Sequence, residues 1–236
     1  MGMYGERALQ LSSTAKKRRA VAPDNIIDLK SIVVVEKIES VPARPVYAFI
    51  KRTFDIAASL IGAVLAVIPM LFIALAIRLD SKGPVFFTQE RLGKDGKPFR
   101  LYKFRSMRVD AEKNGAQWAA KNDERVTRVG GFLRKTRLDE LPQLWNILAG
   151  EMSFVGPRPE REVFYEEFEK HIRGFKQRLM VKPGLTGWAQ VNGGYDLGPE
   201  EKIVYDVEYI KNASIRMDLK CILKTVGIVF SHDGAR

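Results

Sequence analysis

An acidic pair directly follows a run of basic residues. Asp139 and Glu140 stand just after Arg134, Lys135 and Arg137. Nearby cations favour the ionised form of a carboxylate, and the same cations attract phosphate groups. An aspartate can attack phosphorus as a covalent nucleophile. The pattern therefore indicates phosphoryl-transfer chemistry at this pair.

The same pair is also compatible with an ordinary helix start. Asp139 would be a favourable N-cap, Glu140 suits a first turn, and Pro142 tolerates an early helical position. Thr136, three residues before Asp139, could supply a local cap. Spacing alone favours this structural interpretation, whereas the basic neighbours favour the chemical one.

Three further cations are candidates for binding phosphate. Arg158 lies between Pro157 and Pro159, which restrict the backbone, and its planar guanidinium can grip a phosphate with two hydrogen bonds. Lys103 and Arg105 are two residues apart on a predicted strand and therefore point to the same face. The alternatives are a rigid turn with a solvated arginine and a solvated strand face.

A glycine-rich stretch, residues 183–194, is a weaker candidate. Its glycines allow the backbone to approach a ligand closely. Trp188, Gln190 and Asn192 could pack against and hydrogen-bond a base or a sugar. A glycine-rich loop is not by itself specific for any ligand.

An apolar segment of the chain is long enough to enter a membrane and to hold these residues near its surface. Residues 56–77 contain no charged side chain, and a helix of that length reaches about 30 Å, the thickness of a hydrocarbon core. Pro69 lies inside the run, where it removes a helix hydrogen bond. Both flanks of the run are basic, whereas a spanning helix should have more Lys and Arg on its cytoplasmic flank than on the other. Physical reasoning leaves a spanning helix and a re-entrant helix–break–helix both open.

The remaining pattern predicts an α+β domain that is mostly helical. An Asp-Gly turn signal separates two strand-like runs, which indicates a small β-hairpin. Residues 183–198 are predicted to be loop, and 31–36 have strand composition. The hairpin strands are expected at 84–89 and 99–104, and helices at 108–122, 136–149, 160–176, 199–212 and 219–230.

Composition limits the class of protein. The 236 residues carry a formal net charge of +11, which favours anionic partners. Cys221 is the one cysteine and is expected in the core, and His171 and His232 show no metal-ligand spacing. The basic cluster at 16–19 either contacts anionic lipid or is a solvated tail. The apolar run disfavours nucleic acid as the partner.

Five segments in order resemble the bacterial sugar transferase family of monotopic phosphoglycosyl transferases. The resemblance covers about residues 51 to 230. It is carried by residues 51–55 (Lys-Arg-Thr-Phe-Asp), 103–107 (Lys-Phe-Arg-Ser-Met), 138–144 (Leu-Asp-Glu-Leu-Pro-Gln-Leu), 155–159 (Val-Gly-Pro-Arg-Pro) and 182–187 (Lys-Pro-Gly-Leu-Thr-Gly).

The resemblance implies a reaction at the membrane. Members transfer a phosphosugar from a UDP-sugar to polyprenyl phosphate, in bacteria usually undecaprenyl phosphate, and release UMP. This is the first membrane step of exopolysaccharide, capsule or O-antigen synthesis. The implied roles are Asp139 as nucleophile, Glu140 as its assistant, both as magnesium ligands, and the four cations Arg134, Arg158, Lys103 and Arg105 at phosphates.

The resemblance also implies an organisation of the chain. The anchor is expected to be re-entrant, although the family often has Ser-Pro at the break and this chain has Ile68-Pro69. We expect a small family member with a cytosolic tail (1–46), a re-entrant anchor (47–80) and a catalytic domain (81–236). It should contact membrane lipids on the cytoplasmic face of the inner membrane.

Two questions stay open at this point. The oligomeric state is open between a monomer and a homodimer. The competing functions are a non-catalytic basic protein that binds the membrane surface and a membrane phosphatase that hydrolyses an aspartyl phosphate. Kinase and P-loop signatures are absent from the sequence.

Overall fold

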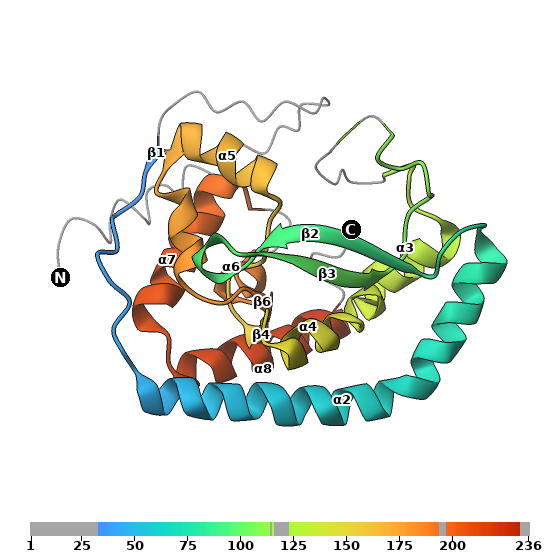
Figure 1. Cartoon of the computed structure of the whole chain (residues 1–236), viewed down its shortest axis with the longest axis horizontal. Helices are drawn as coiled ribbons and strands as arrows, with labels where there is room; N and C mark the ends of the chain where they lie inside the picture. The colour runs from blue at the N-terminus through green and yellow to red at the C-terminus, as the bar shows by residue number, and fades with distance from the viewer. Residues whose placement is uncertain (1–32, 114, 116–122, 194–196, 232–236) are drawn as a thin grey trace. The chain divides into compact units, whose positions relative to one another are not determined.

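The computed structural model describes residues 33–113, 115, 123–193 and 197–231. Its longest element is helix α2 (Pro45–Asp80), which runs beneath the other elements in Figure 1. The helix continues through Pro69, and its axis bends in the half that contains this residue. The expected break is therefore a bend in a continuous helix, because a proline removes one hydrogen bond and leaves the flanking turns intact.

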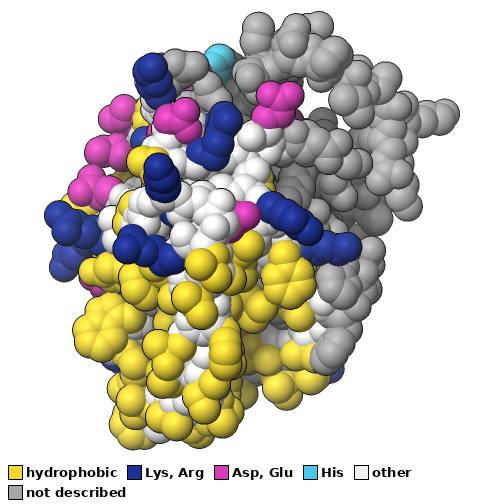
Figure 2. All heavy atoms as spheres, turned by 90° about the vertical axis from the view of Figure 1, so that its right-hand side faces the viewer, with side chains coloured by type: hydrophobic (Ala, Val, Ile, Leu, Met, Phe, Trp, Pro, Cys, Tyr) yellow, Lys and Arg dark blue, Asp and Glu magenta, His cyan; other side chains and the backbone are white. Residues whose placement is uncertain are grey.

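Most of α2 is not covered by the rest of the protein. Large apolar side chains along it are exposed, among them Phe49 (74%), Leu65 (73%) and Leu79 (79%). Within the described residues, α2 is the one helix long and apolar enough to cross a membrane by length and composition. Figure 2 shows hydrophobic side chains gathered on the lower part of the molecule and charged ones above them. A soluble surface would not carry so large an apolar area.

The first half of α2 is joined to the domain by the polar residues of the segment 51–55. Arg52 donates to the carbonyls of Ile147 (2.6 Å) and Leu148 (2.8 Å), which belong to the last turn of α4 (Gln143–Ala149). Asp55 is buried and accepts from Ser153 Oγ and Phe154 N, both at 3.0 Å. The polar residues of this motif thus fix the position of α2.

The predicted β-hairpin is confirmed. Strands β2 (Phe86–Leu92) and β3 (Pro98–Phe104) pair antiparallel, with Phe86 opposite Phe104 and Leu92 opposite Pro98. The connection is the 3₁₀ turn η1 (Lys94–Gly96), in which Asp95 has a positive φ of 58°. Asp tolerates this conformation better than most residues. The hairpin carries Lys103 toward the centre of the domain.

The segment expected as one helix from 136 to 149 is three elements, so that prediction is wrong. Helix α3 (Arg128–Thr136) ends where Arg137 takes a left-handed conformation with φ 61°. The 3₁₀ turn η2 (Leu138–Glu140) and then α4 follow. A right-handed helix cannot pass through a left-handed residue, so Asp139 and Glu140 lie on a tight turn between two helices.

Two glycine motifs pack against each other. Strands β4 (Ser153–Val155) and β6 (Gly184–Thr186) pair in parallel. A Cβ on Gly184 would lie 2.1 Å from the backbone nitrogen of Gly156, and one on Gly187 would lie 2.1 Å from its carbonyl oxygen. These glycines are thus explained by backbone contact, and they join the loop of Arg158 to the segment 183–187.

The remaining elements enclose the main core. Its centre contains Tyr165, Phe168, Phe175, Ile203 and Ile210, all nearly fully buried. Cys221 is also buried there, as predicted. The elements are β1 (Val33–Val34), which pairs in parallel with β5 (Ile172–Arg173), and α5 (Glu162–His171), η3 (Phe175–Met180), α6 (Trp188–Val191), α7 (Pro199–Asn212) and α8 (Ile215–Ser231).

The outcomes for the other predicted elements differ. The helix expected at 199–212 is confirmed, and the last helix begins four residues before the expected residue 219. The helix expected at 160–176 stops at residue 171, and the stretch expected as loop contains β6 and α6. Residues 109–113 form turns and residue 108 has no regular structure, so the described part of the helix expected at 108–122 is wrong. The basic cluster at 16–19 lies outside the described residues.

Two adjacent glycines in α3 provide a test of how closely this helix packs against the backbone of Ser106. A Cβ on Gly130 would lie 1.9 Å from the carbonyl oxygen of Ser106, whereas one on Gly131 would meet only Val126 at 3.9 Å. Gly130→Ala should destabilise the fold by about 2 kcal/mol, because the backbone must shift. Gly131→Ala should stabilise it by about 0.5–1 kcal/mol, since glycine is unfavourable in a helix. Denaturant midpoints would measure both, and equal midpoints would contradict the tight contact.

Candidate active site

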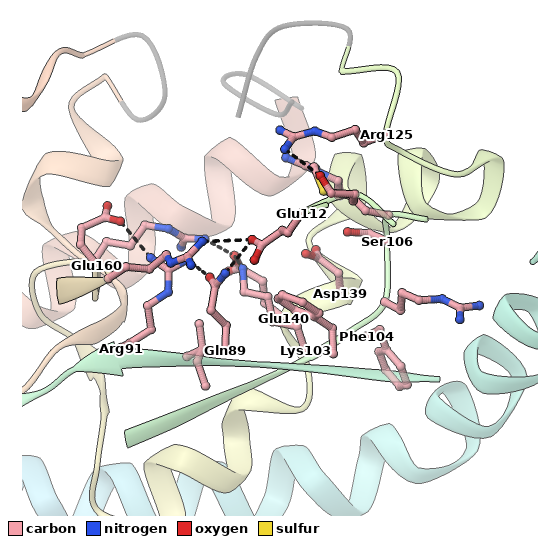
Figure 3. A pocket seen from close by; sticks show the side chains of 18 of the residues that line it. Gln89, Arg91, Lys103, Phe104, Ser106, Glu112, Arg125, Asp139, Glu140 and Glu160 are labelled. Atoms are coloured by element: carbon pink, nitrogen blue, oxygen red, sulfur yellow. Dashed lines mark hydrogen bonds and ion pairs between the residues drawn. The ribbon is translucent and has the colours of Figure 1, made fainter. Parts of the chain in front are cut away.

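A cavity of about 350 Å³ opens beside the hairpin and contains both residues of the acidic pair. Figure 3 shows Asp139 and Glu140 on the same side of the hairpin as Lys103. Eleven Lys or Arg side chains line the cavity against four Asp or Glu side chains. Such a cavity attracts ligands with several negative charges.

Glu140 is held by two cations. Its Oε1 accepts from Arg158 Nη2 at 2.5 Å and from Lys103 Nζ at 3.2 Å. The three side chains come from η2, from the Gly-Pro-Arg-Pro loop and from β3, so the ion pairs join three separate segments. Lys103, Glu140 and Arg158, which were predicted together, therefore meet in one network.

The two carboxyl groups have opposite protonation behaviour. Burial alone would raise the pKa of Glu140, but Arg158 and then Lys103 outweigh it and hold this pKa far below the usual range. Burial raises the pKa of Asp139, and the nearby Lys103 compensates only in part. Glu140, rather than Asp139, is therefore the carboxylate that the cations keep ionised.

Asp139 does not act as a helix cap. Helix α4 has no side-chain cap, and Thr136 donates its hydroxyl to the carbonyls of Phe132 and Leu133 instead. Within the described part of the chain, Asp139 has no hydrogen-bond or ion-pair partner, although it is 7% exposed. A buried carboxyl group without a structural partner is typical of a reactive group.

The turn that carries Asp139 is strained. Arg137 has a left-handed backbone conformation that side chains other than Gly, Asn and Asp seldom adopt. It ends α3, and its neighbour Arg134 at the end of that helix also lines the cavity. Strain of this kind is frequent at functional sites, where it sets the direction of a reacting group.

A buried ion pair supports Arg158 from behind. Arg178 donates from Nε to Asp206 at 2.6 Å, and both side chains are almost fully buried. The Nη2 of Arg178 donates to the carbonyl oxygen of Arg158 at 2.9 Å. The guanidinium also lies 4.9 Å from the centre of the Phe175 ring. The backbone of Arg158 is therefore attached to the main core.

Arg105 lines the cavity but makes structural contacts. It donates to the carbonyls of Ser81 (2.7 Å) and Lys82 (2.9 Å), just after α2. Asp80, the last residue of α2, accepts from Val129 N in the first turn of α3. In this geometry the guanidinium holds the end of the long helix. A phosphate contact by Arg105 stays a prediction.

The cavity wall also contains residues that the sequence did not single out. Gln89 donates to Glu112 at 2.9 Å, and Arg161 donates to the same carboxylate at 3.1 Å. Arg91 pairs with Glu160 at 2.9 Å. In Figure 3, Arg91 and Glu160 lie farther from Asp139 than Glu112 does. The alternation of side chains between the two faces of a strand could have indicated Gln89 and Arg91, because both lie on one face of β2.

The three candidate residues of the glycine-rich stretch have different surroundings in the structure. Gln190 lines the cavity and donates to the carbonyl of Leu185. Trp188 and Asn192 are not among the residues that line it. Trp188 donates to Glu208, and Asn192 accepts from Lys224 at 2.7 Å. The structure therefore gives these two side chains contacts with the closing helices, and their nucleotide or sugar contact stays a prediction.

The acidic pair offers ligands that suit magnesium. Mg²⁺ prefers oxygen ligands and commonly uses one or two carboxylates together with substrate phosphates and water. Asp139 and Glu140 supply two carboxyl groups on one cavity wall. The described residues contain no group of three or more His, Cys, Asp or Glu placed to hold a metal ion. The pair therefore fits a metal that shares its coordination with a substrate.

The chain is similar to known proteins over most of its length. The model of the family described as bacterial sugar transferase matches residues 46–232. The chain is 47% identical over 195 residues to UDP-N-acetylgalactosamine-undecaprenyl-phosphate N-acetylgalactosaminephosphotransferase of Aeromonas hydrophila, covering 81% of this chain and 46% of the relative.

Two relatives differ in the sugar that their names give. The chain is 42% identical over 205 residues to UDP-glucose:undecaprenyl-phosphate glucose-1-phosphate transferase of Escherichia coli, covering 81% of the chain and 44% of the relative. It is 37% identical over 218 residues to undecaprenyl-phosphate galactose phosphotransferase of Salmonella typhimurium, covering 86% of the chain and 45% of the relative. The chain thus spans less than half the length of these relatives.

Proposed function

This chain belongs to the bacterial sugar transferase family, and from that premise we propose that it transfers a phosphosugar from a UDP-sugar to undecaprenyl phosphate. The observation that carries the proposal is the buried Asp139 carboxyl group, which has no partner in the described structure and faces a cavity lined by an excess of cations. A diphosphate donor and a phosphate acceptor both match that charge.

The proposed reaction has two steps. In the first, Asp139 attacks the phosphorus that bears the sugar, the bond from that phosphorus to the bridging oxygen breaks, and UMP leaves. In the second, a phosphate oxygen of the lipid attacks the same phosphorus and Asp139 is released. Each substrate then reacts in turn with one nucleophile, which is ping-pong kinetics.

The surrounding residues have distinct roles in these steps. Arg158 and Lys103 hold Glu140 ionised beside the nucleophile, and with Arg134 they balance the charge that develops on the phosphoryl oxygens. Asp139 and Glu140 would hold Mg²⁺, which when bound would add positive charge at the substrate phosphates. The strained turn at Arg137 directs Asp139 into the cavity.

The anchor places the reaction at a membrane surface. We propose that α2 enters the inner membrane from the cytoplasmic face and returns to it, so that the catalytic domain meets nucleotide sugars. Support comes from its exposed apolar side chains, its basic flanks and the bend in its second half. Both halves of α2 also contact the same domain, through Asp55 in the first half and Asp80 at the end of the second.

Cysteine labelling can test this topology. The native Cys221 is buried, so new cysteines at the exposed positions Val46 and Lys82 can be labelled selectively. A membrane-impermeant maleimide should label both in inside-out vesicles and neither in right-side-out vesicles. Labelling of one position from each side would show a spanning helix and overturn the re-entrant proposal.

UMP release tests the reaction itself. The purified protein would be incubated with Mg²⁺, undecaprenyl phosphate and each of several UDP-sugars, including those with glucose, galactose and N-acetylgalactosamine. We expect UMP release with one or more donors and a sugar diphosphate on the lipid. Free sugar phosphate without lipid product would indicate a phosphatase, and no release with any donor would favour a non-catalytic membrane-binding protein.

The protonation of Asp139 predicts the pH dependence of the first step. Because burial raises the pKa of Asp139, its reactive carboxylate is lost as pH falls through a pKa above the usual aspartate range. The kcat/KM for the donor should therefore rise with pH across that raised pKa. Lys103 is the charge that acts most strongly to lower this pKa, so Lys103→Met should move the rise to higher pH. A rise that stays in place or moves to lower pH would contradict the assignment.

A further inference from the structure

A second cavity of about 280 Å³ adjoins the active site. It shares Arg137, Glu140 and Gln190 with the charged cavity, so the two cavities adjoin at Glu140. Its other walls come from the start of α4, from β4, β6 and α6, and from α8. These walls are formed by Leu141, Leu144, Phe154, Leu185, Thr186, Val191, Ile222, Thr225, Val226, Ile228 and Val229. We call it the apolar groove.

The two threonine hydroxyl groups of the groove walls have partners within the protein, whereas Gln190, which the groove shares with the charged cavity, has a buried side-chain oxygen without a hydrogen-bond partner in the described structure. The hydroxyl groups of Thr186 and Thr225 lie 2.6 Å apart and bond to each other. Thr225 also donates to the carbonyl oxygen of Cys221 at 2.7 Å. Because these hydroxyl groups are satisfied within the protein, the middle of the groove favours hydrocarbon over a sugar or a nucleotide.

One wall of the groove continues onto the exposed apolar surface. Val226 and Val229 line the groove and are 49% and 37% exposed. Leu219 (53%) and Leu223 (63%) extend the exposed apolar side chains along the same helix. Among the described residues that line the groove, the charged ones are Arg137 and Glu140, which it shares with the charged cavity, so the rest of the wall offers an uncharged surface to a hydrocarbon chain.

We propose that the apolar groove binds the isoprene units next to the phosphate of the acceptor lipid. This inference rests on the proposed function and adds the site of the acceptor. The acceptor joins an anionic phosphate to hydrocarbon, and the two cavities offer the same pairing in the same order. The groove volume is at the lower end of ligand sites, so it holds the first units while the rest of the chain stays in the bilayer.

Filling the groove with a larger side chain tests the assignment. Val226→Trp and Val229→Trp would occupy the groove from its exposed side, and Leu223→Trp is the matched control on the same helix outside the groove. Each protein is placed in lipid nanodiscs. Two quantities are measured: the equilibrium affinity for undecaprenyl phosphate without donor, and stoichiometric UMP release from the donor without acceptor.

The groove variants should bind undecaprenyl phosphate at least about tenfold more weakly, because they lose contacts along several methylene groups. Their stoichiometric UMP release should match that of the wild type, and the Leu223 control should match it in both measurements. Unchanged lipid affinity in both groove variants, or an equal loss in the control, would overturn the proposal. Loss of UMP release in both groove variants would overturn it as well, since their side chains would then belong to the donor site or the fold.

The same two measurements separate this inference from the proposed function. If the wild type binds the lipid and releases no UMP with any donor, the transferase reaction is wrong. The lipid affinities of the three variants then still decide whether the groove is where the lipid binds.

Discussion

Asp139→Asn is expected to reduce turnover by at least about a thousandfold, since removal of a covalent nucleophile removes the reaction path. The change keeps the shape of the side chain and breaks no hydrogen bond within the described structure. The thermal midpoint should not fall at neutral pH, because burial disfavours the ionised form of Asp139 in the folded protein. Steady-state UMP release and a thermal melt would measure the two effects.

Intact-protein mass spectrometry gives a second readout for this variant. Wild-type protein given donor without acceptor should gain the mass of one phosphosugar, and the Asp139 variant should gain none. Asp110→Asn removes a carboxylate from an exposed ion pair with Arg108 and should behave like the wild type. A mass increase that persists in the Asp139 variant would assign the nucleophile to another residue.

Arg158→Ala is expected to lower kcat/KM by roughly a hundredfold or more, because charge-balancing groups at a reacting phosphate have effects of that size. The variant should also lose roughly 2 kcal/mol of stability, less than for a fully buried pair, since Lys103 still contacts Glu140. Urea unfolding and initial rates would measure both losses.

The pH dependence of stability identifies the cause. The lowered pKa of Glu140 contributes stability that is present above its unfolded pKa and is lost as pH falls through the folded value. In Arg158→Ala the folded pKa of Glu140 moves toward the unfolded one, so this loss should be smaller and should be complete at a higher pH. Lys170→Ala, which removes a cation from an exposed pair with Glu167, is the control and should match the wild type. Near wild-type turnover by the Arg158 variant would refute its role.

Patterns of neighbouring residues predicted the elements that are determined by residues close together in the sequence. The hairpin follows from strand composition around an Asp-Gly turn, and the helix Pro199–Asn212 begins at a proline in its first turn. The split of the segment 136–149 was not visible, because Arg137 has no intrinsic preference for its left-handed conformation. The pairing of β4 with β6 is non-local, so a stretch that looks like loop became strand.

The candidate site was predictable to a similar extent. Ordered motifs indicated that Lys103, Glu140 and Arg158 belong together, and the structure brings them together. Charge alone could not separate Arg105, which holds the end of α2, from a cation that faces a ligand. Nor could composition show that burial raises the pKa of Asp139, whereas Arg158 and Lys103 outweigh burial and lower the pKa of Glu140.

The attachment of α2 at both ends has a consequence for control by the bilayer. Arg52 and Asp55 fix its first half, and Asp80 and Arg105 fix its end to the elements that carry the acidic pair. In the proposed arrangement, a change in bilayer thickness that shifts the depth of α2 must shift the height of Asp139 above the headgroups with it. Membrane composition would then set how easily a lipid phosphate reaches the nucleophile, without any change in the substrates themselves.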